Sequence, residues 1–336
     1  MALKTVVVGA GAVSGAWFAP LLHEQVEIAA VVDLRIDAAR ARIASHHLQA
    51  EASTDLAAAL DKVRPDFVVD LTVPEAHRQV TCTALEAGCH VIGEKPMAPS
   101  MAEAREMLRT AERTGKLYMV SQSYRWEPHQ EAVRRALSAR VIGNITTINC
   151  DFYLGAHFAG FREEMSSPLI LDMAIHHFDL ARFMTRADPV AVYAKEFNPK
   201  GSWYKGDVAA SCIFDMTDGI VFTYRGSWCA EGFHTSWNGD WRIIGERGAL
   251  LYQQDQDPKV QVVAGDTGFN RPLTERAVPV PQLEATAQHG ALREMLRFLH
   301  TGEAPQCECH DNIKSLAMCF AAIESSKQGC RVPVAI

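Results

Sequence analysis

The sequence lacks an excess of positive charge. Its 336 residues contain 33 Lys and Arg against 40 Asp and Glu, which gives a formal net charge of −7 at pH 7. The basic residues are spread along the chain without a long run. Proteins that bind nucleic acid or anionic lipid usually carry a basic patch, because they must neutralise phosphate groups. The composition therefore argues against nucleic acid and membrane surfaces as partners.

Long apolar runs are missing as well. No segment approaches the roughly 18 apolar residues that a membrane span needs. The segment 6–22 follows Lys4 and could be mistaken for a signal peptide, but Gly9, Gly11 and Gly15 interrupt it and a strand–helix pattern continues from it. We therefore expect a cytoplasmic protein.

The cysteines do not form a disulfide or metal framework. They number nine and lie at scattered positions, which is typical of a protein from a reducing compartment. The nearest approach to a metal-binding cluster is Cys307-Glu308-Cys309-His310, with no second ligand pair nearby, whereas zinc sites usually need four ligands at paired spacings. We predict no metal centre and interpret this segment as a loop with buried or idle thiols.

The first 122 residues contain an alternation of short apolar strands and amphipathic helices. Strands are predicted at 5–9, 27–33, 66–72, 90–93 and 117–122. Helices are predicted at 16–23, 37–45, 55–62, 77–87 and 100–114. Apolar strands that alternate with helices are typical of a doubly wound parallel sheet. We predict an α/β Rossmann domain over residues 1–122.

The pattern changes after about Gln122. A helix at 131–138, a strand at 145–153 and a helix at 169–184 are followed by several strands in succession. These strands are predicted at 190–197, 207–216, 220–228, 241–245 and 260–263, and two helices at 285–299 and 312–328 close the chain. The pair Asp218-Gly219 is a strong hairpin signal. We predict an α+β domain over residues 123–336 with a mostly antiparallel open sheet.

A glycine-rich loop, residues 9–15, connects the first strand to the first helix. Gly9 permits a tight turn and Gly11 lets the backbone approach a pyrophosphate, to which the helix offers free N–H groups and its positive dipole end. Ser14 stands where a third glycine is usual, and its hydroxyl could donate to phosphate. Such a loop can serve a turn alone, but Asp33 at the end of the second strand also fits a dinucleotide site.

Asp33 also bears on the choice of cofactor. A carboxylate at this position accepts hydrogen bonds from the ribose hydroxyls of NAD and repels the 2′-phosphate of NADP. Arg35 lies two residues further on and could partly neutralise that repulsion. We favour NAD, with NADP as the alternative. A solvated charge at the start of a helix is the structural alternative for Asp33.

Two further segments contain candidate catalytic residues. Lys95, in Glu94-Lys95-Pro96, follows a predicted strand, and its ammonium could stabilise a developing alkoxide, although a surface salt bridge is the simpler interpretation. Asp172, His176 and Asp179 share one face of a predicted helix, and a histidine beside a carboxylate can accept a proton. The alternatives are a core histidine satisfied by Asp179, or a metal site built on Asp172, His176 and His177.

The sequence resembles the Gfo/Idh/MocA oxidoreductases, a family named for glucose–fructose oxidoreductase and inositol dehydrogenase. The resemblance covers nearly the whole chain and depends on several motifs in the same order. They are the Gly9/Gly11 loop, 72–77 (TVPEAH), Glu94-Lys95-Pro96, 124–128 (YRWEP), 142–145 (IGNI) and the D-x-x-x-H-x-x-D run from Asp172 to Asp179.

The resemblance implies an NAD(P)-dependent dehydrogenase or reductase that acts on CH–OH groups of sugars, sugar derivatives or cyclitols. It implies that the nicotinamide lies at a cleft between two domains, that the second domain binds substrate, and that subunits pair into a homodimer or homotetramer. In this family His176 would take the hydroxyl proton, Lys95 would orient the oxygen and Asp172 would support both. The predicted cofactor-binding residues are Gly9, Gly11, Ala12, Val13, Ser14, Asp33, Arg35, Thr72, His77, Glu94 and Lys95.

Substrate specificity is expected to depend on the aromatic segments 157–162 and 203–204, whose rings could stack on a pyranose. The candidate substrate-binding residues are Tyr124, Trp126, His157, Arg162 and His177. Ordinary aromatic packing is the alternative for each of them. Ser166-Ser167-Pro168 and Ala174 replace glycines that are usual in the family, so no particular sugar is carried over.

Two other functions stay open from the sequence. The first is a non-catalytic, NAD-responsive regulator on the same fold; it is disfavoured because Lys95, Asp172 and His176 are all present. The second is a metal-dependent hydrolase or lyase built on Asp172, His176 and His177. Adjacent residues point about 100° apart on an α-helix, so His176 and His177 could not easily chelate one ion.

Overall fold

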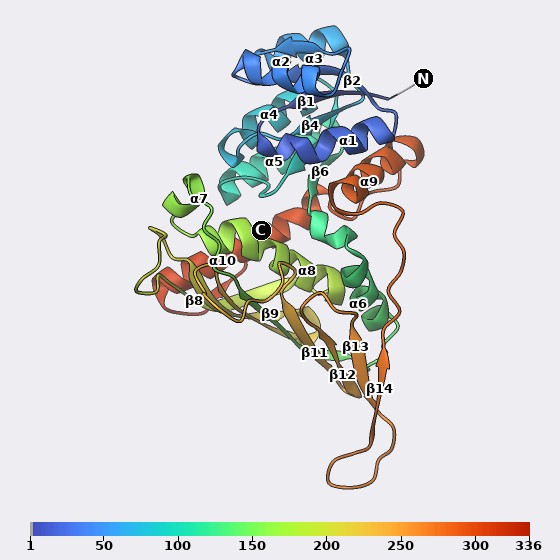
Figure 1. The fold of residues 1–336 in the computed structure, drawn as a ribbon, viewed down its shortest axis with the longest axis vertical. Helices are drawn as coiled ribbons and strands as arrows, with labels where there is room; N and C mark the ends of the chain where they lie inside the picture. The colour runs from blue at the N-terminus through green and yellow to red at the C-terminus, as the bar shows by residue number, and fades with distance from the viewer. Residues whose placement is uncertain (1–2) are drawn as a thin grey trace. The chain divides into compact units, whose positions relative to one another are not determined.

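A computed structural model describes residues 3–336 (Figure 1). The chain forms two compact units. One consists of the chain up to Ser123 together with Glu284–Ile313, and the other of Tyr124–Leu283 together with Lys314–Ile336. The division into a cofactor domain over 1–122 and a substrate domain over 123–336 stays a prediction.

The first unit is built on a six-stranded sheet in the order β3-β2-β1-β4-β5-β6. All five pairings are parallel. The strands are β1 (Lys4–Val8), β2 (Glu27–Val32), β3 (Glu51–Ser53), β4 (Phe67–Asp70), β5 (His90–Glu94) and β6 (Tyr118–Ser121). The central strands are apolar and fully buried, as in Val6, Val7, Val68 and Val69, because helices cover both faces of such a sheet. The predicted doubly wound α/β fold is confirmed.

The helices of this unit follow the strands in alternation. They are α1 (Gly15–His23), α2 (Ile36–Ser45), α3 (Leu56–Val63), α4 (Pro74–Glu86), α5 (Met101–Thr114) and the later helix α9 (Ala287–Thr301). Local signals define several ends. The Ser100 hydroxyl accepts a hydrogen bond from Glu103 N at the start of α5, and Gly115 closes that helix with φ 64°.

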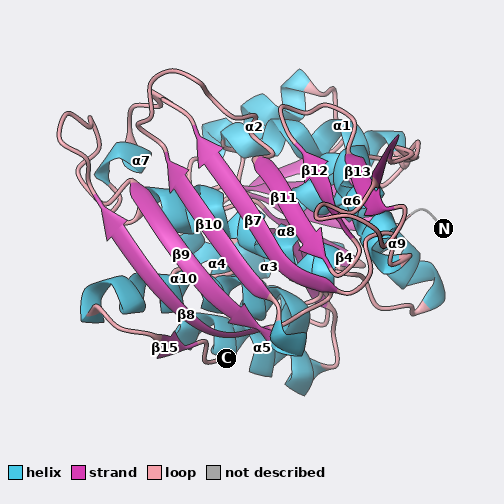
Figure 2. Cartoon of the chain, turned by 90° about the horizontal axis from the view of Figure 1, so that it is seen from below, coloured by secondary structure: helices cyan, strands magenta, loops and turns pink. Residues whose placement is uncertain are grey.

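The second unit is built on a nine-stranded sheet (Figure 2) in the order β14-β13-β12-β11-β7-β10-β9-β8-β15. Its pairings are antiparallel except β10 with β7, which is parallel. The strands are β7 (Ile145–Tyr153), β8 (Pro189–Phe197), β9 (Ala209–Met216), β10 (Val221–Ser227), β11 (Asp240–Gly245), β12 (Gly248–Tyr252), β13 (Lys259–Val263), β14 (Leu273–Ala277) and β15 (Val332–Pro333). The predicted mostly antiparallel sheet is confirmed, including the hairpin at Asp218, whose φ is 60°.

One face of this sheet carries helices and the other is open. Figure 2 shows the strands in front, with the helices of this unit behind them. These helices are α6 (Pro128–Ser138), α8 (Ile175–Thr185) and α10 (Cys309–Gln328), with the short α7 (Phe161–Glu164) beside the sheet. The part of α10 from Lys314 onward belongs to this unit. The strands therefore alternate buried and exposed residues, and Tyr193, Phe197 and Ile213 lie on the exposed set.

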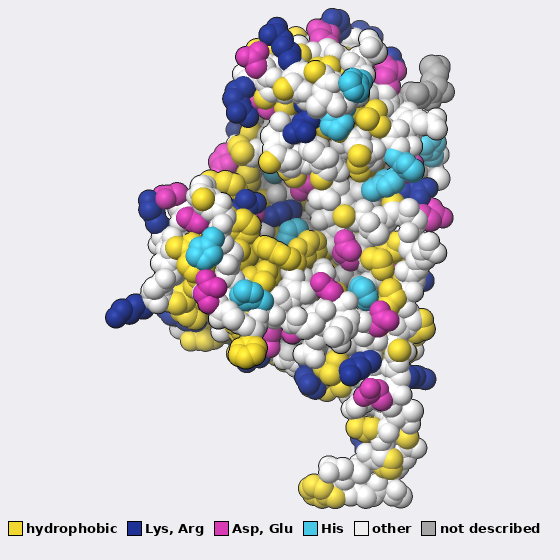
Figure 3. All heavy atoms as spheres, viewed as in Figure 1, with side chains coloured by type: hydrophobic (Ala, Val, Ile, Leu, Met, Phe, Trp, Pro, Cys, Tyr) yellow, Lys and Arg dark blue, Asp and Glu magenta, His cyan; other side chains and the backbone are white. Residues whose placement is uncertain are grey.

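Charged side chains of both signs are interspersed on the molecular face shown in Figure 3. Over residues 3–336, no helix combines the length and the apolar character that a membrane span requires.

Candidate functional site

The glycine loop begins with a position that only glycine can occupy. Gly9 has φ 96°, and a Cβ added to it would lie 2.6 Å from the carbonyl oxygen of Leu71. Gly11 differs, because its φ is −71° and an added Cβ would meet no protein atom within 4 Å. The fold therefore requires Gly9, whereas the open space at Gly11 fits the close approach of a ligand such as a dinucleotide pyrophosphate.

Internal hydrogen bonds hold the loop in shape. Ser14 is fully buried and its hydroxyl donates to Gly11 O at 2.7 Å. Arg42 Nη2, from α2, donates to the same carbonyl at 3.0 Å. The structure thus commits the Ser14 hydroxyl to the loop itself rather than leaving it to face a phosphate, while Ala12 and Val13 lie in the helical turn that leads into α1. Arg42 was missed from the sequence, because nothing near it in the sequence marks its contact with the loop.

Asp33 stabilises the glycine loop by a hydrogen bond to its backbone. Its Oδ2 accepts a hydrogen bond from Ala10 N at 2.8 Å, and its Oδ1 accepts one from Arg35 N at 2.8 Å. The Arg35 side chain is largely exposed, with Nε 3.8 Å from Asp33 Oδ1. Asp33 therefore stands at the end of β2 next to the glycine loop, where a ribose acceptor is expected in an NAD site.

The ends of β4 and β5 are tied together by His77. Its Nδ1 lies 2.9 Å from Pro96 O and its Nε2 lies 3.1 Å from Thr72 O. His77 is buried, and each of its ring nitrogens faces one of these carbonyls, which accepts a hydrogen bond from the nitrogen that carries the proton. The structure thus favours a positioning role for His77 over direct contact with the cofactor.

Glu94 holds the segment that contains Lys95. It is buried, and its Oε1 accepts a hydrogen bond from Trp17 Nε1 at 2.8 Å. Burial raises the pKa of the Glu94 carboxyl, and the Trp17 hydrogen bond and the Lys95 charge partly oppose that rise. Lys95 follows directly after β5, at the carboxyl edge of the parallel sheet where open α/β folds bind ligands.

In the second unit, Asp172 and His176 lie on a helix that changes its pitch between them. Leu169–Ala174 is a π-helix, and α8 begins at Ile175. The prediction of one continuous α-helix is therefore corrected for its first turns, since a π-helix has more residues per turn. Such π segments occur frequently at functional sites.

The Asp179 carboxylate forms its hydrogen bonds with an arginine and a serine, not with a histidine. Its carboxylate accepts hydrogen bonds from Arg125 Nε at 2.7 Å and from Arg125 Nη2 at 2.6 Å, and from Ser315 Oγ at 2.7 Å. This pair is buried and fixes Arg125, in the 3-10 turn Ser123–Trp126, against α8. The interpretation of His176 as a core histidine satisfied by Asp179 is therefore wrong.

The neighbour of His176 is Tyr124. The two rings are stacked, with centroids 4.3 Å apart and planes inclined by 13°. Burial raises the pKa of the Tyr124 phenol, and the charges of Glu127, Asp255 and Asp172 raise it further, so the phenol is neutral near pH 7. His176 itself is 7% exposed. A nearly buried imidazole with a fixed ring plane can transfer a proton in a defined direction.

Asp172 pairs with Arg162 of α7. Arg162 Nε donates to Asp172 Oδ2 at 2.5 Å. The guanidinium carbon lies 5.0 Å from the Phe158 ring centroid and 4.8 Å from that of Phe161. The pair lies close enough to Tyr124 for the Asp172 charge to affect that phenol. Asp172, His176, Tyr124 and Arg162 thus form one group within the second unit.

His177 lies in the core. It is fully buried, its Nε2 lies 3.3 Å from Trp237 O, and its ring contacts Phe152 and Tyr224. Burial lowers the pKa of His177 to about 3. This packing favours a structural role for His177 over contact with substrate.

The other candidate substrate-binding residues are dispersed. Trp126 is buried, whereas His157 stacks on Trp203 with centroids 3.7 Å apart and lies 3.0 Å from Glu231 Oε1. The hydroxyl of Tyr204 donates to Ala156 O at 2.7 Å. His157 and Trp203 therefore form an aromatic pair near the start of the loop that contains Arg162.

Possible metal ligands gather at two places in residues 3–336, and neither includes Asp172, His176 or His177. One place is His23, Glu24 and His289; the other is Glu308, Cys309 and His310. In the second, His310 Nδ1 lies 2.8 Å from Glu308 Oε2. In both groups the short distances are also explained by ion pairs between histidine and glutamate, without a metal ion.

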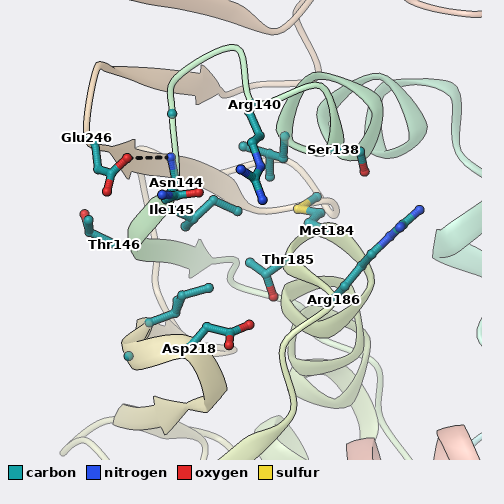
Figure 4. A pocket seen from close by; sticks show the side chains of 14 residues that line it. Ser138, Arg140, Asn144, Ile145, Thr146, Met184, Thr185, Arg186, Asp218 and Glu246 are labelled. Atoms are coloured by element: carbon teal, nitrogen blue, oxygen red, sulfur yellow. Dashed lines mark hydrogen bonds between the residues drawn. The ribbon is translucent and has the colours of Figure 1, made fainter.

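A pocket of about 700 Å³ lies in the second unit at the C-terminal ends of α6 and α8 (Figure 4). Its lining contains Arg140 and Arg186 as well as Asp218 and Glu246, so its charge is mixed. It contains none of the residues predicted for the site.

Two family profiles match successive parts of the chain. The profile of the GFO/IDH/MocA "Oxidoreductase family, NAD-binding Rossmann fold" matches residues 3–122, and that of the GFO/IDH/MocA C-terminal domain matches residues 130–251. The chain is similar to D-glucoside 3-dehydrogenase of Escherichia coli, with 32% identity over 69% of this chain and 70% of that protein. It is also similar to D-apiose dehydrogenase of Paraburkholderia graminis, with 27% identity over 82% of this chain and 74% of the relative.

Among solved structures, the fold is similar to an oxidoreductase from Agrobacterium radiobacter in complex with NAD⁺, L-tartaric acid and magnesium. The TM-score is 0.87 at 22% identity, over 99% of both chains. Together, the two family profiles and the glucoside dehydrogenase establish that the chain belongs to the GFO/IDH/MocA oxidoreductase family, with its NAD-binding Rossmann fold and its C-terminal domain.

Proposed function

We propose that the chain transfers a hydride between a nicotinamide cofactor and a hydroxyl-bearing carbon of a sugar, sugar derivative or cyclitol. The observation that carries the proposal is His176, a nearly buried imidazole stacked on the neutral Tyr124 ring and four residues after Asp172. This is the arrangement that a general base for a substrate hydroxyl needs. The named relatives act on D-apiose and D-glucosides, which supports the substrate class.

Lys95, Asp172 and His176 are the proposed catalytic residues. The nicotinamide, when bound, accepts the hydride from the carbinol carbon. His176 takes the proton of the substrate hydroxyl. The carbinol carbon and its oxygen then become a carbonyl group. The Lys95 ammonium donates to the same oxygen and stabilises the negative charge that develops on it. Asp172 supports the charge state of both groups. In the reverse direction His176 would return the proton to the oxygen as a general acid, and the hydride would come from the reduced nicotinamide.

NAD is the preferred cofactor in this proposal. Asp33 is a hydrogen-bond acceptor at the position that faces the adenosine ribose in Rossmann sites, where a carboxylate disfavours a 2′-phosphate. Its contact with Ala10 N links it to the glycine loop. The exposed Arg35 lies against Asp33 Oδ1 and is the residue that could allow weak use of NADP.

The proposed active form is a homodimer or homotetramer that assembles through the open face of the nine-stranded sheet. Tyr193, Phe197 and Ile213 are 49%, 44% and 50% exposed on adjacent strands β8 and β9. Large apolar side chains grouped on an open sheet are typical of a surface that another subunit covers. Nucleic acid and membrane are not proposed as partners.

A substrate panel tests the function. Sugars, sugar acids, alditols and inositols are offered with NAD and NADP in parallel, and reduction is followed by the absorbance of the reduced nicotinamide. We expect oxidation of at least one polyhydroxylated substrate, with a higher kcat/KM for NAD than for NADP. If the protein binds NADH but oxidises no member and reduces none of the corresponding carbonyl compounds, the proposal is wrong.

A further inference from the structure

Arg162 is more constrained than a surface arginine, although it is not fully buried. It lies on the short helix α7, and its guanidinium is flanked by two aromatic rings, with centroid distances of 5.0 Å to Phe158 and 4.8 Å to Phe161. Aromatic rings near a guanidinium favour the cation and restrict the positions that it can adopt. Its hydrogen bonds must therefore be made mainly at its edges.

Only one of those edges is used. Nε donates to Asp172 Oδ2 at 2.5 Å, and among residues 3–336 no group accepts a hydrogen bond from either Nη atom. A guanidinium has five N–H donors in a planar fork, and its terminal Nη1/Nη2 edge matches a carboxylate with two parallel hydrogen bonds. The Arg162 side chain is 34% exposed, so solvent and ligands can reach part of it.

The acidic side chains near Arg162 on the same loop already have partners. Glu163 Oε1 accepts a hydrogen bond from Ala159 N, and Glu164 pairs with Lys205. The Nη edge offers one planar two-donor fork, which matches the two coplanar oxygens of a single carboxylate better than the tetrahedral oxygens of a phosphate.

We infer that Arg162 is the carboxylate-binding residue of the substrate site, and that the substrate is a sugar acid, such as an aldonate or a uronate, rather than a neutral sugar. This inference depends on the proposed function, because Asp172 is one of the proposed catalytic residues. Arg162 would connect the catalytic Asp172 to the substrate carboxylate, because its Nε edge contacts Asp172 and its Nη edge would contact the carboxylate. The carboxylate is not changed in the reaction; it fixes which hydroxyl lies at His176.

The test compares matched substrates and variants. Each sugar acid is paired with its neutral counterpart, an aldonate with the alditol and a uronate with the aldose, and a sugar phosphate forms a third arm. The variants are Arg162→Met, which removes the fork, and Arg162→Lys, which keeps the charge without the fork. Arg113→Met is the control, since Arg113 pairs with Glu86 on the surface of the other unit.

The wild-type protein is expected to have a kcat/KM at least about 10-fold higher for the acid than for its neutral counterpart, because a charge-assisted fork binds only the acid. Arg162→Met should raise the KM for the acid by about 10- to 100-fold and change the KM for the neutral sugar by less than about threefold. Arg162→Lys should lie between the two, and Arg113→Met should match wild type. NADH binding and thermal melting verify that each variant is folded.

Several results would overturn the inference. Wild-type preference for neutral sugars or for the phosphate arm contradicts a carboxylate site but leaves the proposed function intact. An equal fall in kcat on acid and neutral substrates in Arg162→Met contradicts it too, because Arg162 would then only position Asp172. If wild type acts on no member of any arm, the proposed function fails together with it.

Discussion

The imidazole of His176 lies nearly parallel to the phenol ring of Tyr124, at a centroid distance of 4.3 Å. Tyr124 begins the second unit, and the adjacent Arg125 is locked to Asp179, three residues after His176 on the same helix α8. One short turn therefore supports both the ring plane of the proposed base and the helix that carries it. This relationship connects the stability of the second unit to the proposed chemistry.

The stack makes Tyr124 a positioning residue for His176. Tyr124→Phe keeps the ring and should retain kcat within about threefold, whereas Tyr124→Ala should lower kcat by about 10- to 100-fold, because a small misplacement of a catalytic group is costly. The KM for substrate should change less than kcat in Tyr124→Ala. Steady-state kinetics of the two variants measure this. Equal losses in both variants would show that the hydroxyl, rather than the ring, is the part that matters.

The Arg125–Asp179 pair is expected to be a major contributor to the stability of the second unit. Its side chains are only 5% and 2% exposed, so removal of one partner takes a bidentate counter-charge away from a buried group. Arg125→Met or Asp179→Leu alone should lower the free energy of unfolding by about 3–5 kcal/mol. The double variant should be more stable than either single one. Urea denaturation measures all three proteins, and simple additivity of the two losses would contradict this interpretation.

Asp33 should control the cofactor preference. Asp33→Asn keeps an oxygen that can accept from Ala10 N but removes the charge, and Asp33→Ala removes both. Asp33→Asn should lower the ratio of kcat/KM for NAD to that for NADP by about 10-fold or more, because repulsion of the 2′-phosphate is lost. Asp33→Ala should also weaken NAD binding. An unchanged cofactor ratio in Asp33→Asn would mean that Asp33 serves only the loop.

Glu196 should make the stability of the protein depend on pH. It is buried on β8, next to Ser167 Oγ at 3.3 Å, and burial raises its pKa to about 7, with Asp207 adding to the rise. The folded state therefore keeps a proton that the unfolded chain releases near pH 4.5. The stabilising effect of this proton is complete below about pH 4.5 and is lost as the pH rises to about 7.

The variant Glu196→Gln cannot lose that proton. At pH 8 it should be more stable than wild type by about 3 kcal/mol, and near pH 4.5 the two should be equal. Urea denaturation at a series of pH values measures the difference. Glu324→Gln, on the exposed face of α10, is the control and should follow wild type throughout. A constant offset between Glu196→Gln and wild type at all pH values would contradict the expected titration.

Periodicity and turn residues predicted much of the fold. The bounds of β7 at 145–153 and the hairpin at Asp218-Gly219 were correct, since both depend on local patterns. The three-residue β3 and the fully exposed β14 were not predicted, because neither has a run of alternating apolar residues. The return of Glu284–Ile313 to the first compact unit depends on tertiary contacts that no local pattern encodes.

The candidate site was predictable where a residue type alone carries the chemistry. The spacing of Asp172 and His176 identified both as candidate site residues. It did not predict the π-helix that contains Asp172, because a pattern with a 3.6-residue period cannot reveal a turn with more residues. The burial of His177 and the contact of Arg42 with Gly11 O also required the structure. Both depend on which neighbours the fold supplies from distant parts of the chain.

The most direct test of the proposed chemistry measures turnover and cofactor affinity together in Lys95→Met and His176→Asn. Lys62→Met, which removes an exposed lysine paired with Glu51, is the matched control. On the substrate found in the panel, both site variants should lose about 10²- to 10⁴-fold in kcat, the usual contribution of a positioned acid or base. Their Kd for NADH, measured by fluorescence, should stay within about threefold of wild type, because the glycine loop and Asp33 are expected to supply most of the cofactor affinity. Turnover close to that of wild type in both variants, with NADH still bound, would contradict the account.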